Sequence, residues 1–436
     1  MKVNRVAAVP IITHDPYFSV WAPGDHLYDA DTIHWSGLSQ KVTGYVTVDG
    51  RVFRFLGKGY EREEVIEQTS LDITANATTY TFENEDIVLD VRFLSPLLLN
   101  DLDILARPCT YVDYTVKRKK ACDVNVEFVL SDELVQRNKD ALNWVEGTSP
   151  LADGKGEFAY ASMGRAKQKP LGNSGDSITI DWGFAYLACL AGEGRTYFDK
   201  GNRSLVASLC LGKDKSEASM IVAYDDLLSI NYFGEWRKGY WTKKYKTIFQ
   251  AIAGAFEDKE ETLKKAKALD EDVEKRALAS GGEDYALLCI MSYRQSICAH
   301  KLITDEDGNV IFLSKENDSN GCIGTVDVSY PSIPLYLIYN PELVKGMIRP
   351  IMRFADYDVW NFDFAPHDVG RYPYAWGQAY GANRGMDGNS RIFYTGEGDT
   401  ILPAFYMLPA SSTAYDVRYQ MPVEECGNML IMTAVV

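Results

Sequence analysis

Residues 314–330 read S-K-E-N-D-S-N-G-C-I-G-T-V-D-V-S-Y and gather acids and amides among glycines. Glu316 and Asp327 offer carboxylates, and Asn317 and Asn320 offer amides that both donate and accept hydrogen bonds. The polar half alone is typical of a solvated loop, but it continues directly into an apolar run that contains Asp327. We therefore expect Asp327 to be buried. Because a buried carboxylate is costly unless it is paired or used, Asp327 is a candidate site residue.

Two further polar clusters follow this stretch. Residues 360–374 read W-N-F-D-F-A-P-H-D-V-G-R-Y-P-Y, and residues 421–428 read M-P-V-E-E-C-G-N and open an apolar helix. The adjacent His367 and Asp368 either form a protonation pair or cap a helix, and Glu424 with Glu425 either act in a site or do no more than favour the helix dipole. Three such clusters joined by mostly buried helices predict the central pocket of an α/α toroid.

Toward the amino terminus the pattern changes to a period of two, which is typical of strands. Residues 43–48 and 51–55 flank Asp49-Gly50, the strongest short-range signal for a β-hairpin. Further strands are expected at 80–82, 87–93, 111–116, 124–130, 184–190, 205–211 and 218–223, with a surface loop at 155–176. Many short strands without intervening helices predict an antiparallel β-sandwich.

The middle of the chain changes from strands to helices. The aromatic segment 231–241 is expected to pack at a seam between domains, and helices are expected at 244–256, 260–278, 284–301, 331–339 and 342–354. The helix at 284–301 is apolar nearly all round, which predicts burial. Residues 305–316 partly fit a calcium-loop template, but Val310 stands where the template needs Gly, so a hairpin at Asp307-Gly308 is preferred.

These patterns predict a multidomain β plus α protein. We expect a β-sandwich domain at 1–243, a helical linker at 244–283, and the amino-terminal part of an α/α toroid at 284–436. The fold class is thus an amino-terminal antiparallel β-sandwich followed by an α/α toroid, and the family resemblance described below implies that this is an incomplete (α/α)6 toroid of the six-hairpin glycosidase type.

Composition narrows the class of partner. The formal net charge of −16 argues against binding to nucleic acid or to an anionic membrane, and favours a small-molecule substrate such as an amino acid amide or a sugar. No apolar run of about 18 residues and no signal peptide are visible, so a cytoplasmic location is expected. The eight cysteines are scattered without metal-ligand spacing, so neither a metal nor another cofactor is predicted.

The long motifs of the chain resemble those of the fungal glutaminase A type family and its bacterial relatives. The resemblance rests on T-H-D-P-Y-F-S-V-W (13–21), S-K-E-N-D-S-N-G-C-I-G-T-V-D-V-S-Y-P-S (314–332), A-P-H-D-V-G-R-Y-P (365–373) and M-P-V-E-E-C-G-N-M (421–429). It implies a β-sandwich followed by a six-hairpin domain, with hydrolysis of glutamine to glutamate as the activity. Residues 380–420, including 383–389, are longer and more irregular than the corresponding link in the family.

We therefore expect a cofactor-independent hydrolase that uses paired carboxylates, since no Gly-x-Ser-x-Gly elbow is present. The catalytic candidates are Asp327, Asp368, Glu424 and Glu425. The candidates for substrate binding are Glu316, Asn317, Asn320, Trp360, His367, Arg371, Tyr372 and Asn428. Glycoside hydrolysis, with sugars stacked on aromatic side chains, and carbohydrate or partner binding without catalysis are the alternatives.

Chain length leads to a further expectation. A six-hairpin toroid needs twelve helices, or roughly 300 residues, and the part after residue 284 holds only about half of that. The sequence therefore predicts a truncated form of a longer protein. We expect the open face of its toroid to favour oligomerisation.

Overall fold

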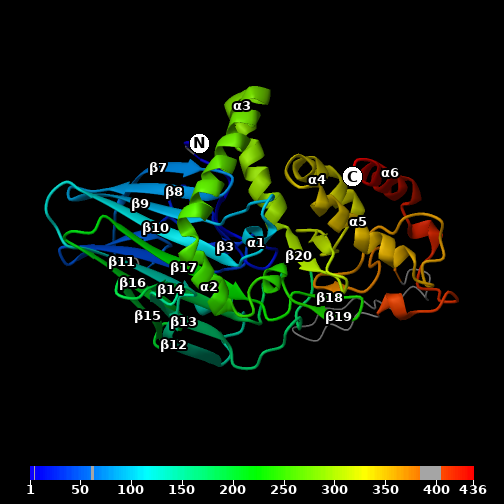
Figure 1. Cartoon of the computed structure of the whole chain (residues 1–436), viewed down its shortest axis with the longest axis horizontal. Coiled ribbons are helices and arrows are strands. Elements are labelled where there is room, and N and C mark those ends of the chain that lie inside the picture. Colours follow the sequence, from blue (N-terminus) through cyan, green and yellow to red (C-terminus); the bar gives the residue numbers. More distant parts are fainter. Residues whose placement is uncertain (4, 60–62, 383–403) are drawn as a thin grey trace.

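The computed structural model describes residues 1–3, 5–59, 63–382 and 404–436. Two large sheets form its amino-terminal half (Figure 1). In the order of hydrogen-bonded neighbours, the eight-stranded sheet consists of β12 (Leu142–Pro150), β13 (Glu157–Arg165), β14 (Phe184–Leu190), β17 (Glu217–Asp225), β10 (Cys109–Arg118), β9 (Ile87–Leu94), β8 (Ala77–Glu83) and β7 (Glu67–Ile73). The six-stranded sheet consists of β15 (Gly194–Asp199), β16 (Ser204–Gly212), β11 (Val124–Ser131), β4 (Val42–Val48), β5 (Arg51–Leu56) and β6 (Glu64–Val65).

Neighbouring strands in both sheets run antiparallel, apart from the short pair of β5 with β6. Every second side chain of β4 and β11 is buried, so one face of this sheet packs into the core. The predicted hairpin is confirmed, since Asp49 and Gly50 both have positive φ (47° and 83°) between paired strands. The predicted sandwich is therefore confirmed.

The sequence prediction misplaced two parts of this half. Residues 155–176 are not one surface loop, because strand β13 lies within this range and pairs with β12 on one side and with β14 on the other. Its neighbour β12 is an edge strand with mostly exposed side chains, so it lacks the apolar alternation that marks a half-buried strand.

A third, three-stranded sheet lies near the amino terminus, and the helices follow the sandwich. The small sheet holds β1 (Val9–Thr13), β2 (Ser19–Ala22) and β3 (Ile33–His34). The helices are α1 (Leu102–Leu105), α2 (Ile248–Glu257), α3 (Lys259–Cys298), α4 (Val326–Tyr339), α5 (Pro341–Ala355) and α6 (Pro422–Ala434). Short 3-10 turns lie at Asp132–Leu134, Tyr240–Lys243, Phe405–Met407 and Val417–Tyr419. None of the helices in the described residues is long and apolar enough to cross a membrane.

The long helix α3 is broken at Gly282, whose φ of 79° and ψ of −165° no helix accommodates. The break falls at the Gly-Gly pair that separates two predicted helices. The second segment ends at Cys298 rather than at residue 301. It is also less buried than predicted, since Tyr285 and Leu288 are 45% and 61% exposed. At the start of α5, Asn340 caps the helix and Pro341 takes the first position.

The chain after α3 forms a hairpin that leads into the helical half. Its strands are β20 (His300–Thr304) and β21 (Val310–Ser314), and the turn contains Gly308 with a φ of 84°. The hairpin preferred over a calcium loop is thus confirmed. Strand β21 ends at Ser314, so this hairpin sets the position at which the polar stretch 314–330 begins.

Main-chain hydrogen bonds join the two halves of the molecule. Strand β18 (Ile230–Tyr232) pairs antiparallel with β19 (Glu235–Arg237) and parallel with β22 (Tyr374–Ala375), which belongs to the helical half. The aromatic segment 231–241 therefore lies at the seam, as its composition predicts. In Figure 1 the sheets and the helices α4–α6 lie on opposite sides of α3 and this seam.

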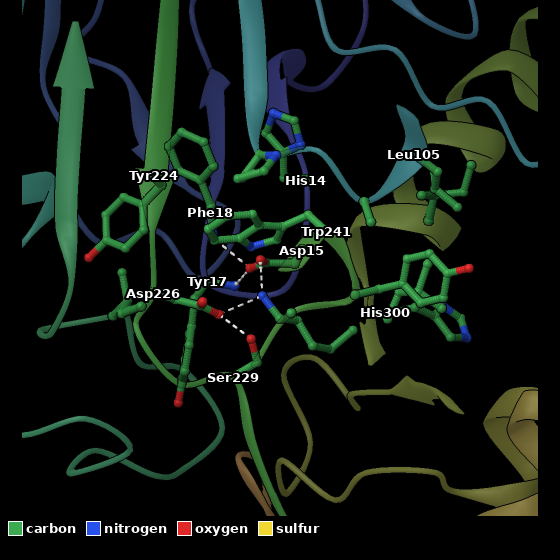
Figure 2. Close-up of a pocket in the computed structure, with 18 of the residues that line it drawn as sticks. His14, Asp15, Tyr17, Phe18, Leu105, Tyr224, Asp226, Ser229, Trp241 and His300 are labelled. Carbon is green, nitrogen blue, oxygen red and sulfur yellow. Dashed lines mark hydrogen bonds and ion pairs between the residues drawn. The ribbon is translucent and has the colours of Figure 1, made fainter. Parts of the chain in front are cut away.

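A buried group of charges lies at the same seam. The Lys301 ammonium donates to Asp15 Oδ2 and to Asp226 Oδ2, both at 2.7 Å, and Asp15 and Asp226 point toward one another in Figure 2. Asp15 also accepts hydrogen bonds from the backbone N–H groups of Tyr17 and Phe18 at 2.9 Å. Burial alone raises the pKa of the Asp15 carboxyl, but the Lys301 charge and the hydrogen bonds from Lys301, Phe18 and Tyr17 together outweigh it, so this pKa lies below its ordinary value. A cavity of about 40 Å³ beside the charges has room for little more than water.

Removal of the Lys301 charge is expected to destabilise the whole fold. The substitution Lys301→Met leaves two buried carboxylates without a counter-charge, which costs about 3–5 kcal/mol of the free energy of unfolding. Chemical denaturation monitored by circular dichroism measures the loss. The exposed Lys213, replaced in the same way, is the control and is expected to change stability by less than about 0.5 kcal/mol. Equal stability of the two variants would show that the buried charges contribute nothing.

Candidate active site

Three segments that are far apart in the sequence meet at one place in the helical half. They are the first turn of α4, the loop after α5, and the first turn of α6. The first two are tied together by main-chain bonds, because Val326 N–H donates to the His367 carbonyl at 2.8 Å and Ile323 N–H donates to the Gly370 carbonyl at 2.9 Å. The stretch 314–330 and the His-Asp cluster therefore run side by side.

Asp327, His367 and Glu425 are the side chains that meet there. One ring nitrogen or carboxylate oxygen from each lies within 4.8 Å of the others. His367 Nε2 lies 3.7 Å from Asp327 Oδ1, which is too long for a hydrogen bond. Asp327 and Glu425 both occupy first turns of helices, where the positive end of the helix dipole favours a carboxylate.

The carboxyl groups of this cluster are not engaged in holding the fold together. Within the described part of the chain, neither carboxylate oxygen of Glu425 has a hydrogen-bond partner, although the residue is only 1% exposed. Asp327 Oδ1 likewise has none. The Asp327 side chain is 30% exposed, so the prediction that it is buried is wrong. Its place in the first turn of α4, rather than within an apolar strand, opens it to solvent.

Asp368 binds the ring nitrogen of His367 that lies away from Asp327. Its Oδ2 accepts from His367 Nδ1 at 2.9 Å and from the Tyr380 N–H at 3.0 Å. Its Oδ1 accepts from the N–H groups of Gly370 and Ala379 at 2.9 and 2.7 Å. The carboxylate is fully buried and all of these bonds order the loop, so Asp368 fixes the orientation of the imidazole.

Burial and the charges of the cluster shift the pKa values of His367 and Glu425. Burial lowers the pKa of His367, but the hydrogen bond to Asp368 and the charges of Asp368, Glu425 and Asp327 raise it to about 9. Burial raises the pKa of Glu425, His367 opposes this, and Asp327 adds to it, with a result of about 8. These shifts favour the charged form of His367 and the protonated form of Glu425.

Glu316 lies next to this cluster and Lys315 lies beyond it. Glu316 is 9% exposed and its Oε1 accepts from Thr325 Oγ1 at 2.7 Å, while burial raises the pKa of its carboxyl. The Lys315 side chain is fully buried, donates to the Asp176 carbonyl at 2.7 Å and lies over the Trp35 ring. Burial lowers the pKa of Lys315 to about 8. Lys315 was not predicted, because a lysine beside a polar stretch is usually solvated.

Several predicted substrate-binding residues lie elsewhere. Trp360 is 4% exposed, packs edge-on against Phe362 and Phe364, and donates to the Phe364 carbonyl. Tyr372 packs edge-on against Tyr17 at the seam cavity. Both therefore stabilise the fold where they lie.

The other predicted residues are on the rim or in turns. Asn317 and Glu424 are exposed, and Asn428 is half-buried one turn after Glu424. Asn320 Oδ1 accepts from the Cys322 N–H at 2.8 Å and so closes a turn. Arg371 is half-buried, and its Nε has no hydrogen-bond partner among the described residues.

Gln378 is a residue of the site that sequence reasoning missed. It is fully buried, its Oε1 accepts from the His367 N–H at 2.7 Å, and its Nε2 donates to Gln420 Oε1 at 2.6 Å. It thereby joins the histidine loop to the segment that enters α6. Gln378 precedes the irregular link 380–420, of which the predicted insertion 383–389 lies outside the described residues. A single glutamine beside an irregular segment is not part of any motif, so nothing in the sequence indicated that Gln378 belongs to the site.

Comparison with known proteins covers nearly all of this chain. The family model described as the glutaminase A six helical-hairpin domain matches residues 282–436. Two models described as domains of unknown function match residues 76–211 and 202–276 (DUF5127) and residues 2–66 (DUF4964). A solved structure provisionally assigned as a kojibiose phosphorylase from the human microbiome has a TM-score of 0.45 and 11% identity, covering 79% of this chain and 47% of its own.

Two curated relatives align along almost the whole chain. Glutaminase A of Aspergillus oryzae is 26% identical over 477 residues, which cover 98% of this chain and 62% of the relative. A probable glutaminase of Arthroderma benhamiae is 21% identical over 489 residues, which cover 98% of this chain and 52% of the relative. The chain thus spans less than two thirds of the length of either relative. With the six-hairpin model on the helical half and both relatives aligned along 98% of this sequence, the chain resembles the glutaminase A type family over nearly its whole length.

Proposed function

We propose that the protein is a hydrolase of the glutaminase type, in which Asp327, His367 and Glu425 form the reacting centre. Its reaction would release ammonia from an amide such as glutamine, as the names of both curated relatives suggest. The observation that carries the proposal is the set of convergent carboxylate oxygens that have no partner in the described part of the chain. Buried polar groups that the fold does not use are available to water and substrate.

The positions of the two carboxyl groups suggest different roles. Asp327 is the more exposed of the two and is placed to take a proton from an attacking water molecule. Glu425 lies deeper and is placed to exchange a proton with the leaving nitrogen. His367, oriented by Asp368, lies within 4.8 Å of both acids, and its charge opposes the rise in the pKa of Glu425.

Glycoside hydrolysis is the second candidate, and the spacing of the acids favours it. The nearest oxygens of Asp327 and Glu425 lie within 4.8 Å. Carboxyl groups stand about 5–5.5 Å apart in retaining glycosidases and about 6.5–9.5 Å apart in inverting ones. If the substrate is a glycoside, the expected outcome is retention of configuration.

A direct assay separates these functions. The purified chain is incubated with glutamine, with ammonia as the measured product, and with aryl glycosides, with the released phenol as the measured product. Ammonia release supports the glutaminase proposal, and phenol release supports the glycosidase. Binding of either substrate without turnover would instead support a binding protein without catalysis.

Neutral replacements in the centre are expected to remove turnover and leave the fold intact. Asp327→Asn and Glu425→Gln keep the side-chain shapes and remove only the ionisable groups, so each is expected to lower kcat by about 10²-fold or more. Steady-state kinetics measures the loss, and a thermal melt checks the fold. Asp363→Asn is the matched control, because Asp363 is exposed on the same loop as His367. Turnover within a few-fold of the wild type in either variant would exclude that residue from the reaction.

The positioning role of Asp368 predicts a different result. Asp368→Asn places an amide N–H₂ where N–H groups now donate, so the imidazole loses its fixed orientation. We expect kcat to fall about 10–100-fold while KM changes little, since Asp368 does not face substrate. Kinetics at saturating and at low substrate concentration separates the two constants. A loss confined to KM would contradict the positioning role.

A further inference from the structure

Glu425 poses an energetic problem that the described residues do not solve. A carboxyl group that is 99% removed from solvent normally accepts hydrogen bonds, yet neither of its oxygens has a hydrogen-bond partner in the described chain. Asp327 Oδ1 in the same cluster also lacks one. Unpartnered oxygens on two acids that lie close together indicate that a group other than the described residues lies between them.

We propose that Asp327, His367 and Glu425 bind one divalent metal ion of the first transition row. The donors would be one carboxylate oxygen from each acid and Nε2 of the imidazole. The donors lie in the first turns of α4 and α6 and in the loop after α5, which are far apart in the sequence, so they form no recognisable metal-ligand motif. This is why sequence analysis predicted no metal.

The surroundings of His367 fit a metal ligand. A histidine that binds a metal through one ring nitrogen nearly always donates its other N–H to a carboxylate or carbonyl. Here Nδ1 donates to Asp368 at 2.9 Å, which leaves Nε2 directed toward Asp327. Asp368 is itself held by three backbone N–H groups, so the carboxylate–histidine pair is already oriented.

The distances allow the ion with small adjustments. Metal bonds to nitrogen and carboxylate oxygen are about 2.0–2.2 Å long, so two ligands of a tetrahedral ion are about 3.3–3.6 Å apart. His367 Nε2 and Asp327 Oδ1 are already 3.7 Å apart. All the donor atoms lie within 4.8 Å of one another, so no pair has to move closer by more than about 1 Å. The terminal torsion of a glutamate turns broadly enough to do this.

The mixed donor set indicates the class of ion. Imidazole suits zinc, iron, nickel and copper, and carboxylates suit manganese, magnesium and calcium. One imidazole with two carboxylates therefore favours Zn²⁺ or Mn²⁺ over Ca²⁺ and Mg²⁺, which prefer oxygen ligands alone. Three protein ligands leave a coordination position for water or substrate. In the hydrolysis proposed above, such an ion would polarise the scissile carbonyl or activate the water.

Metal binding by variants of the chain is the test. Protein freed of metal with a chelator is titrated with Zn²⁺ by isothermal calorimetry, and with Mn²⁺ by electron paramagnetic resonance. We expect one ion per chain in the wild type and a loss of affinity of about 100-fold or more in Glu425→Gln and Asp327→Asn. Asp363→Asn, altered at an exposed acid on the same loop as His367, is expected to keep the ion.

The variants decide the result because other groups can also bind zinc. The exposed Cys210 and the half-buried Cys426 are free thiols, but thiolates do not favour Mn²⁺. Zinc bound equally by all variants, or no binding of either ion by folded wild-type protein, would overturn the proposal. A thermal melt of each variant shows that it is folded, and the wild-type melt should rise with the ion.

Turnover measured on the same samples separates this inference from the proposed function. Activity on glutamine or a glycoside without any bound ion overturns the metal site alone. An ion held by the predicted donors, with no turnover on either substrate, overturns the hydrolase alone.

Discussion

The ion triad of Lys301 with Asp15 and Asp226 is the contact on which the rest of the arrangement depends. Asp15 comes from the segment between β1 and β2, Asp226 follows the last long strand of the sandwich, and Lys301 lies on the first strand after α3. Three parts of the chain are thus held at one buried point. Because β20 pairs with β21, the position of Lys301 also fixes the start of the stretch 314–330. The geometry of the candidate site therefore begins at the seam.

The site itself follows one simple principle of helix electrostatics. Asp327 and Glu425 each lie in the first turn of a helix, and His367 is brought between them by a loop whose hydrogen bonds run through Asp368 and Gln378. The groups that hold this loop are saturated with hydrogen bonds, whereas the groups at its centre are not. This contrast separates the supporting residues from those that face water or a ligand.

Much of the fold could be predicted from sequence because its signals are local. Asp49-Gly50 is a turn wherever it lies between strands, and the Gly281-Gly282 pair ends a helix without help from its surroundings. The three polar clusters were visible as unusual composition, and the structure brings one member of each together. The edge strand β12 was missed because solvent on most of its surface removes the periodic signal.

The remaining features depend on contacts between distant residues. No local sequence pattern around Lys301 indicates that Asp15 and Asp226 are its partners. Lys301 was instead predicted to be the last residue of a helix. The same holds for Asp368, which was predicted as catalytic from its place beside His367 and is occupied by four hydrogen bonds. Trp360 was predicted to bind substrate, yet it is packed against Phe362 and Phe364. Sequence gives the residue type, but only the fold tells whether the group is still free to act.

The parallel pairing of β18 with β22 has a consequence for how the chain can be divided. The Asn231 N–H donates to the Pro373 carbonyl at 3.0 Å and the Phe233 N–H to the Ala375 carbonyl at 2.9 Å, so one sheet crosses the boundary between the halves. Separation of the sandwich from the helices would expose an unpaired strand edge on each piece and leave Asp15 and Asp226 facing each other without a cation. The two halves therefore behave as a single cooperative unit, and neither is a module that can be moved to another protein on its own.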